Sequence, residues 1–321
     1  MGIIDTITEK DYCFGLVVFN DSFSILDYSQ SFRIEGMEII YQKRIGNVLL
    51  PKTTIIQADP FLFAWNDKLY LFYESMKSGK KGIINMINTT DLKNWSKPIN
   101  VLDETFHLSF PFVFEINGYI YMIPESEAAD EIRLYKANNN ITKFSYVKTL
   151  LKSNRTDSIF FNYSDSHVVL YNGLYFLFTS VLYKWEYHLE LYYTDDLLYK
   201  PLKKHPKSPI CISNKYGRSG GCILNTNNGL LRVAQNCAHS YGANISLLRI
   251  TCLTPEDYAE EAISDDIYNP SDNIFQDGGH HLNTITFKGS HIFATDYRRR
   301  KWCWYQRYTI LKDKLKNKMS L

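Results

Sequence analysis

Carboxylates stand at both ends of the segment from Asp59 to Glu74, which otherwise consists mainly of aromatic and aliphatic residues around the dipeptide Asn66-Asp67. An alternating apolar run, a turn dipeptide and a second apolar run form the pattern of a β-hairpin. The two chain ends of a hairpin lie side by side, so this pattern brings Asp59 and Glu74 together. Carboxylates that share a partly desolvated place have pKa values pushed apart, and one can then act as an acid while another acts as a base.

The same arrangement recurs four more times, and the starts of successive copies are 51, 55, 56 and 60 residues apart. Hairpins that repeat at this distance, each followed by more polar strand-like sequence, are typical of the blades of a β-propeller. We therefore predict an all-β fold, a five-bladed β-propeller that forms one domain over residues 1–321. The blade hairpins are expected to begin near residues 59, 110, 165, 221 and 281. A β-sandwich with accidental internal similarity is the alternative.

Two rings of side chains are expected at one mouth of the propeller channel. In each blade the first strand starts, and the antiparallel second strand ends, at the same face of the propeller. The first ring consists of Asp59, Phe110, Asp165, Gly221 and His281. The second consists of Glu74, Glu125, Ser180, Asn236 and Asp296. Acids, a histidine and small polar groups that converge on one mouth predict a functional site, although scattered polar strand ends would give a similar list.

Carboxylate pairs are what glycosidic chemistry needs around an oxocarbenium-like centre. We predict Asp59 as general base and Glu125 as its acid or stabilising counterpart, with Asp165 and His281 orienting hydroxyl groups or tuning the carboxylates. The predicted substrate-binding residues are Glu74, His107, His167, Arg218, Gln235, Tyr241 and His280. His107 and His167 fit equally well as core histidines, and Arg218 also fits a solvated loop.

Aromatic residues are abundant, with 24 Tyr, 19 Phe and 5 Trp. They favour β-strands, and they also line sugar-binding surfaces because a ring stacks on the apolar face of a pyranose. The net charge of +2 excludes a general nucleic-acid binder, which would be far more basic. No stretch approaches the roughly 20 apolar residues of an integral membrane segment.

The start of the chain lacks the basic and apolar regions of a secretion signal, and the six cysteines lack metal-ligand spacing. We therefore expect reduced thiols and a cytoplasmic location. No cofactor and no tightly held metal are expected. The one credible ligand cluster, His281 with Asp59 and Asp165, would be open and weak.

The remaining segments have simpler predicted roles. The N-terminal run YCFGLVVF is expected to complete a blade and so remove sheet edges. The basic run from Arg298 to Lys301 is expected as a solvated turn, with cations for a diphosphate as the alternative. Residues 311–321 are expected to form a short, basic, frayed tail.

The segment ADPFLFAWNDKLYLFYE resembles the first blade of family 43-like glycoside hydrolases, which are five-bladed propellers whose general base is the Asp of a similar strand. Asp59 matches that position, and His280 or His281 matches a fifth-blade histidine near the channel's ion or water. Phe112 departs from the second-blade Asp of those enzymes, and Ser164-Asp165 departs from their third-blade Glu. The resemblance therefore does not imply an intact family 43 site.

A closer resemblance covers residues from about 50 to 290. The motifs ADPFLF, HLSFPFVFEINGYIYMIPES, DSHVVLYNG, RSGG, AQNCAHSYGANISLLRI and GHHLN are similar, in this order, to the N-terminal propeller domain of plant glucosamine inositolphosphorylceramide transferases. Similar domains occur as stand-alone bacterial proteins associated with surface-polysaccharide synthesis. In the plant proteins a separate C-terminal domain resembles the glycosyltransferase, and the present sequence does not contain it.

Three functions stay open on these observations. The first is a cytosolic sugar transferase, a glycosyltransferase that uses a nucleotide-sugar donor and a glycan or glycolipid acceptor in surface polysaccharide or glycolipid biosynthesis. A partner transferase of the same pathway would fit this role, although no nucleotide-binding motif is recognisable. The second is a glycoside hydrolase related to family 43. The third is a non-catalytic carbohydrate-binding propeller.

Overall fold

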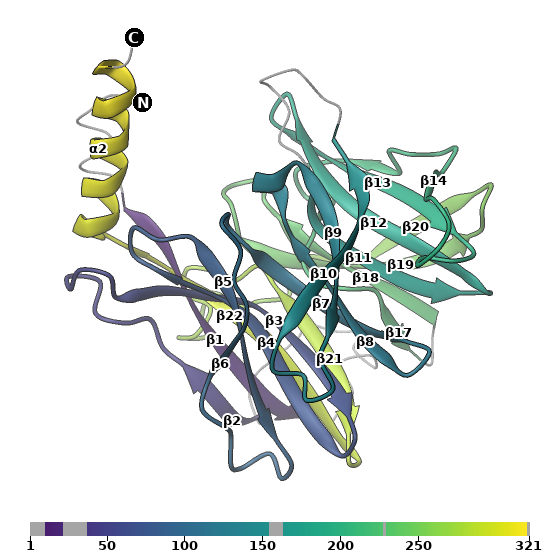
Figure 1. Ribbon diagram of the computed structural model, residues 1–321, viewed down its shortest axis with the longest axis horizontal. Helices are drawn as coiled ribbons and strands as arrows, with labels where there is room; N and C mark the ends of the chain where they lie inside the picture. Colours follow the sequence, from purple (N-terminus) through teal and green to yellow (C-terminus); the bar gives the residue numbers. More distant parts are fainter. Residues whose placement is uncertain (1–9, 22–36, 154–162, 227–228, 320–321) are drawn as a thin grey trace.

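The computed structural model describes residues 10–21, 37–153, 163–226 and 229–319 of the 321-residue chain. These residues form β-strands and their connections, apart from the 3-10 helix η2 (Glu127–Ala129) and the C-terminal helix α2 (Trp304–Met319). The sheets pack side by side, and α2 stands away from them at one edge (Figure 1). The predicted all-β class is confirmed.

Five hairpins, numbered 1 to 5 along the chain, occupy the positions of the sequence repeat. They consist of β3 (Thr54–Trp65) with β4 (Lys68–Lys77), β7 (Ser109–Ile116) with β8 (Tyr119–Glu125), β11 (Ser164–Tyr171) with β12 (Leu174–Tyr183), β17 (Leu224–Thr226) with β18 (Gly229–Asn236), and β21 (Leu282–Phe287) with β22 (Ser290–Lys301). Both turn residues have positive φ in hairpins 1, 2, 3 and 5. Such turns match the twist of the strands, which is why Asn and Gly occupy most of these positions. The turn of hairpin 4 lies outside the described residues.

Outer strands extend each hairpin into a sheet. Hairpin 1 continues with β5 (Gly82–Thr89) and β6 (Ile99–Leu102), and hairpin 2 with β9 (Glu131–Ala137) and β10 (Phe144–Lys152). Hairpin 3 continues with β13 (Glu186–Thr194), β14 (Lys203–Lys204) and β15 (Cys211–Ile212). Hairpin 4 continues with β19 (Asn244–Leu253) and β20 (Tyr258–Ser264), and the short strand β16 (Arg218–Ser219) pairs with β18.

Hairpin 5 receives its outer strands from the other end of the chain. β1 (Asp11–Asp21) pairs antiparallel with β22 along its whole length, and β2 (Glu38–Lys43) pairs with β1. One parallel pair, Phe14 with Ile56, joins β1 to β3, so the sheets of hairpins 5 and 1 form one eight-stranded sheet.

A bulge interrupts the first strand of hairpins 1, 2 and 3 at equivalent positions. The register shifts between Ala58 and Phe61, between Ser109 and Phe112, and between Ser164 and His167. The residue that starts each repeat has a left-handed backbone, with φ of 51° at Asp59, 44° at Phe110 and 50° at Asp165. A bulge re-aims side chains and leaves a backbone amide unpaired in the ladder, so these amides are free to bond elsewhere.

Polar contacts link each hairpin unit to the next in chain order. Backbone amides donate to neighbouring units in five places: Phe110 N to Asp59 Oδ2 (3.1 Å), Asp165 N to Glu125 Oε2 (3.2 Å), Ser219 N to Ser180 Oγ (3.0 Å), Leu282 N to Gly220 O (2.8 Å) and Asp59 N to Asp296 Oδ2 (3.2 Å). The last of these returns from hairpin 1 to hairpin 5. Hydrophobic clusters likewise lie between neighbouring sheets, as where Phe72 of β4 packs with Met122 of β8.

Two expectations for the C-terminal region are wrong. The run from Arg298 to Lys301 is the end of β22 rather than a solvated turn, because Arg298 is buried and its guanidinium donates to the backbone oxygen of Asp277. Residues 311–319 form the second half of α2 rather than a frayed tail. Among the helices of the described residues, none is long and apolar enough to cross a membrane.

Candidate functional site

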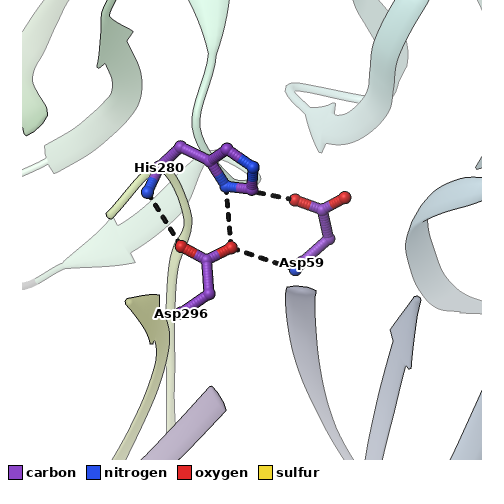
Figure 2. A group of neighbouring side chains, drawn as sticks. All are labelled: Asp59, His280 and Asp296. Carbon is purple, nitrogen blue, oxygen red and sulfur yellow. Dashed lines mark hydrogen bonds and ion pairs between the residues drawn. The ribbon is translucent and has the colours of Figure 1, made fainter. Parts of the chain in front are cut away.

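The first cluster of the site consists of Asp59, His280 and Asp296, drawn in Figure 2. Asp59 lies in the bulge of hairpin 1, His280 lies two residues before hairpin 5, and Asp296 lies in β22. His280 Nδ1 is 2.7 Å from Asp296 Oδ2 and 3.6 Å from Asp59 Oδ1. The backbone amide of His280 donates to Asp296 Oδ1 over 2.8 Å. All three side chains are buried, so their charges interact strongly.

The pKa values of the two carboxylates of this cluster are shifted in opposite directions. Burial disfavours the charged forms of Asp296 and His280, but their mutual attraction prevails, so the pKa of Asp296 is lowered and that of His280 is raised. Burial raises the pKa of Asp59 to about 7, although His280 opposes the shift. The pair therefore favours an ionised Asp296 beside a protonated His280, while Asp59 can gain or lose a proton near neutral pH.

The same three side chains could hold a divalent cation, because each offers one ligand atom and these atoms lie within 4.8 Å of one another. The cation would have to replace the proton that His280 shares with Asp296. The expected ligand cluster of Asp59 with His281 and Asp165 is wrong in its membership. In the described residues, His280 and Asp296 take the places that sequence reasoning gave to His281 and Asp165.

The second cluster consists of Glu125, Asp165, Arg218 and Gln235. Arg218 Nε donates to Asp165 Oδ2 over 2.5 Å, and Arg218 Nη2 lies 3.9 Å from Glu125 Oε2. Gln235 Nε2 donates to the same oxygen of Asp165 over 3.2 Å. Arg218, with a side chain 15% exposed, is thus a partner of two predicted catalytic acids and not a solvated loop charge.

One arginine faces two carboxylates in this cluster, of which Asp165 is buried and Glu125 is partly buried. Burial raises the pKa of Asp165 to about 7 and also raises that of Glu125, with Arg218 opposing both shifts. The nearby acids raise the pKa of Arg218 despite its burial, so the guanidinium stays charged. A single positive charge balances one carboxylate, and the pair therefore keeps a shared proton close to neutral pH.

The two clusters repeat one design. In each, the bulge Asp (Asp59 or Asp165) donates its backbone amide over 3.2 Å to an acid at the end of the preceding hairpin (Asp296 or Glu125). In each, one cation faces both carboxylates. Equivalent positions of the sequence repeat therefore give two clusters of the same composition, each with two acids and one cation.

Tyr241 lies between the two clusters. Its ring is 5.0 Å from the guanidinium carbon of Arg218 and 5.2 Å, edge to face, from the ring of His280. Burial and the acids of both clusters, Asp59, Asp165 and Glu125, raise the pKa of its hydroxyl. A neutral phenol beside these carboxylates can donate a hydrogen bond to a ligand or to an acid.

Glu74 and His107 form a third pair. His107 Nδ1 accepts from the backbone amide of Gly82 over 2.9 Å, so a neutral His107 carries its proton on Nε2. That atom lies 3.4 Å from Glu74 Oε1. Burial, together with Asp59 and Glu125, raises the pKa of Glu74 well above its usual value. His107 is half-buried, and Glu74 is buried beneath it.

His167 and His281 lie deeper, among aromatic rings. His167 stacks on Phe178 with ring centres 5.4 Å apart, and His281 packs edge to face against Phe61 at 4.5 Å. Burial lowers the pKa of each to about 3, so both imidazoles are neutral. His281 Nδ1 is still 3.7 Å from Asp59 Oδ1, which puts it behind that carboxylate.

Sequence reasoning did not select three residues of this region. Asp296 was in the second predicted ring but was not chosen as a site residue. Tyr187 accepts a 3.0 Å bond from Arg218 Nη1, and no motif pointed to it. Trp185, two residues earlier, is 80% exposed with φ of 68° in the turn between β12 and β13. A bulky residue rarely adopts this backbone, so the turn is unusual among the hairpin turns of the described chain.

Comparison with known proteins gives one family. Residues 47–294, more than half of the chain, match the family described as glucosamine inositolphosphorylceramide transferase 1, N-terminal. The protein called glucosamine inositolphosphorylceramide transferase 1 in Arabidopsis thaliana is 35% identical over 211 residues, which are 63% of this chain and 26% of that protein. Its namesake in Oryza sativa subsp. japonica is 35% identical over 215 residues, 64% of this chain and 28% of that protein. The chain therefore spans about a quarter of the length of these relatives.

Solved structures with a similar fold include several glycoside hydrolases. They include a family 117 glycoside hydrolase of Zobellia galactanivorans (TM-score 0.51, 15% identity, 75% of this chain and 84% of that one). They also include the catalytic domain of a GH62 α-L-arabinofuranosidase of Coprinopsis cinerea (TM-score 0.56, 12% identity, 78% and 95%). At such low identity the likeness shows the fold alone, and the neighbours are propeller-fold enzymes.

Proposed function

Because the chain belongs to the family of the N-terminal domain of glucosamine inositolphosphorylceramide transferase 1, we propose that it takes part in transferring a sugar to a glycolipid or glycan. The donor is a nucleotide-activated sugar, and the relatives' name points to an acceptor of the inositolphosphorylceramide type. The reaction belongs to glycolipid or surface-polysaccharide assembly. The carboxylates of the two clusters act on the reacting groups.

One observation carries this proposal: two clusters of the same design, with residues from all five hairpin units, meet at Tyr241. A protein that needed these acids only for stability would not require two carboxylates for each cation, since an unbalanced buried charge is costly. A buried excess of carboxylates with raised pKa values is typical of acid–base sites.

The proposed step assigns one task to each cluster. The acceptor hydroxyl attacks the anomeric carbon of the donor, the bond from that carbon to the phosphate oxygen breaks, and the nucleotide leaves with both bonding electrons. The hydroxyl proton passes to the carboxylate of Asp59. Glu125 and Asp165, with Arg218 beside them, bind sugar hydroxyls and stabilise positive charge that develops on the ring.

The proposal includes the architecture and the location. The five hairpin units form the blades of one five-bladed domain around a channel, which the cycle of contacts from hairpin 1 through hairpin 5 and back supports. The protein works in the cytoplasm, in keeping with six free cysteine thiols.

A second candidate is a sugar-binding domain without catalysis, which serves a partner transferase. One observation favours it: Asp59, Glu125 and Asp296 each accept a backbone amide from a neighbouring unit. Such bonds fix the units relative to one another and would be made by these acids without any reaction.

The experiment is a panel assay with purified full-length chain. Nucleotide sugars are incubated with inositolphosphorylceramide or with soluble glycans, and products are detected by mass spectrometry, while calorimetry measures binding of each compound alone. Transfer dependent on the acceptor supports the proposal. Cleavage of oligosaccharides without a donor would make the chain a hydrolase, and saturable sugar binding without any product would favour the second candidate. If the chain neither binds these compounds nor forms a product, both candidate functions are contradicted.

A further inference from the structure

The C-terminal helix α2 is fixed to the sheets through its first residues. Arg307 forms an ion pair with Asp11 of β1, with Nη2 2.7 Å from Oδ1. Gln306 Oε1 accepts the backbone amide of Gly79 over 2.6 Å. Trp304 Nε1 donates to the backbone oxygen of Leu49. Beyond this base, the helix projects from the edge of the sheets (Figure 1).

An apolar and aromatic surface runs from this base along the helix. Trp304, Tyr308 and Leu315 are exposed, and together with the half-buried Leu311 they recur at the spacing of one helix face. At the base the surface continues onto Leu49 and Leu50, which are 62% and 56% exposed. We call this set of six residues the α2 stripe. Exposed apolar groups that lie together mark an interaction surface more often than isolated ones do.

Positive charge is concentrated in the same part of the chain. Residues 300–321 contain seven Lys and Arg and one Asp, a net charge of +6 in a chain whose total is +2. The rest of the chain therefore sums to −4. Lys312 and Lys314 lie on α2 next to the stripe, and Lys316 and Lys318 follow them in the sequence.

Trp and Tyr with apolar residues on one side and lysines beside them are the composition of helices that lie in the interface of a membrane. Aromatic rings sit at the level of the lipid headgroups, and long lysine side chains reach anionic headgroups while their stems stay apolar. Binding of a nucleic acid would account for the positive charge but not for the exposed apolar residues of the α2 stripe. A protein groove would bury the stripe but would leave the charge unexplained.

We propose that the α2 stripe and the lysines around it bind the surface of an anionic lipid bilayer. α2 is held at Gly79, in the turn that follows β4, the strand that carries Glu74, so a bound membrane would face the side of the molecule on which the carboxylate clusters lie. The inference does not depend on the proposed reaction, although a lipid-borne acceptor would suit it.

The test is co-sedimentation of the full chain with vesicles of phosphatidylcholine alone or mixed with phosphatidylglycerol. Binding is expected only to the anionic vesicles and is expected to weaken as salt is raised. Replacing two lysines of α2 (Lys312→Gln with Lys314→Gln) should lower the partition coefficient roughly tenfold or more. The matched control, Lys93→Gln with Lys97→Gln in the connection between β5 and β6, should leave the partition coefficient unchanged.

A second pair of variants separates lipid insertion from simple charge attraction. Tyr308→Ser with Leu315→Ser should weaken binding at fixed salt. The control, Tyr199→Ser with Leu170→Ser at two other exposed positions, should not. Thermal melts establish that each variant is folded. Three results would overturn the proposal. The first is no binding to anionic vesicles, and the second is an equal effect of the test and control variants. The third is binding to duplex DNA that is as strong as binding to vesicles and is unchanged by the substitutions at Tyr308 and Leu315.

Discussion

At the scale of single residues, the two carboxylate clusters hold more acid than cation. Asp59 and Asp296 face His280, and Glu125 and Asp165 face Arg218. Buried carboxylates that are left without a full counter-charge keep a proton to a higher pH than they would in water. The arrangement therefore links the ionisation of the site to the stability of the whole fold.

This link predicts a pH dependence of stability. Asp165, with a pKa raised to about 7, binds its proton more tightly in the folded state than in the unfolded state. Its contribution to stability is therefore fully present below the unfolded pKa and is lost as the pH rises through about 7. The raised pKa values of Asp59 and Glu125 act in the same direction. The free energy of unfolding, measured with urea at a series of pH values, should fall as the pH rises through neutrality.

Asp165→Asn tests the cause of this slope. The variant removes one excess carboxylate, so its stability should depend less on pH, by up to about 1.4 kcal/mol per pH unit. Asp195→Asn is the control, because Asp195 is exposed and pairs with Lys200 on the surface. An unchanged slope in Asp165→Asn would show that Asp165 is ionised throughout this pH range.

At the scale of elements, the hairpins could be predicted and the bulges could not. Alternating apolar residues around Asn-Gly determine both strands and turn, as at Asn117-Gly118 and Asn172-Gly173. The bulges at Asp59, Phe110 and Asp165 have no comparable signal, since none of the three is glycine and each adopts positive φ because neighbouring units hold its amide or side chain. The helix α2 was missed for a related reason. Its base is fixed by Asp11 and Gly79, which are distant in the sequence.

The turn between β12 and β13 gives an element-scale prediction. Lys184 and Trp185 both have positive φ, and Asn214 holds the turn by accepting from the amide of Tyr187 and donating to the oxygen of Trp185. Trp185→Gly should raise the free energy of unfolding by roughly 1 kcal/mol, because glycine adopts this backbone without strain.

The side chain of Trp185 is 80% exposed, and an exposed indole can stack on a sugar. Trp185→Gly and Trp185→Ala should therefore both weaken saccharide binding, measured by calorimetry, while only the glycine variant gains stability. Equal stability of the two variants would mean that the turn is not strained, and unchanged binding in both would remove Trp185 from the site.

The packing of hairpin 4 against hairpin 5 gives a second element-scale prediction. A Cβ atom on Gly221 would lie 2.1 Å from the backbone oxygen of Leu282, and backbone cannot move aside as a side chain can. Gly221→Ala should therefore lower the free energy of unfolding by more than about 2 kcal/mol. Gly173→Ala, in a turn where a Cβ meets no atom within 4 Å, should cost only about 1 kcal/mol. Similar losses in urea melts of the two variants would contradict this packing.

At the scale of the whole molecule, the repeat predicted which strand ends would meet but not how they would bond. Asp59, Glu125 and Asp165 were chosen because equivalent repeat positions must approach one another, and the structure brings Asp165 and Glu125 to one arginine. Asp296 was passed over because its partner, His280, comes from a connection with no repeat counterpart. His167 and His281 look like ligands in the sequence, yet their burial among Phe rings depends on the packing of several units at once.

The central claim is that these carboxylates act on a sugar. Its most direct test is the turnover of the transferred sugar by the wild-type chain and by Asp59→Asn and Glu125→Gln, each verified as folded by circular dichroism and thermal melting. Removal of a positioned acid or base lowers the rate by about 10²–10⁴-fold, and this is the loss we predict for each variant. Wild-type turnover in both folded variants, or no turnover by the wild-type chain with any donor and acceptor of the panel, would contradict the account.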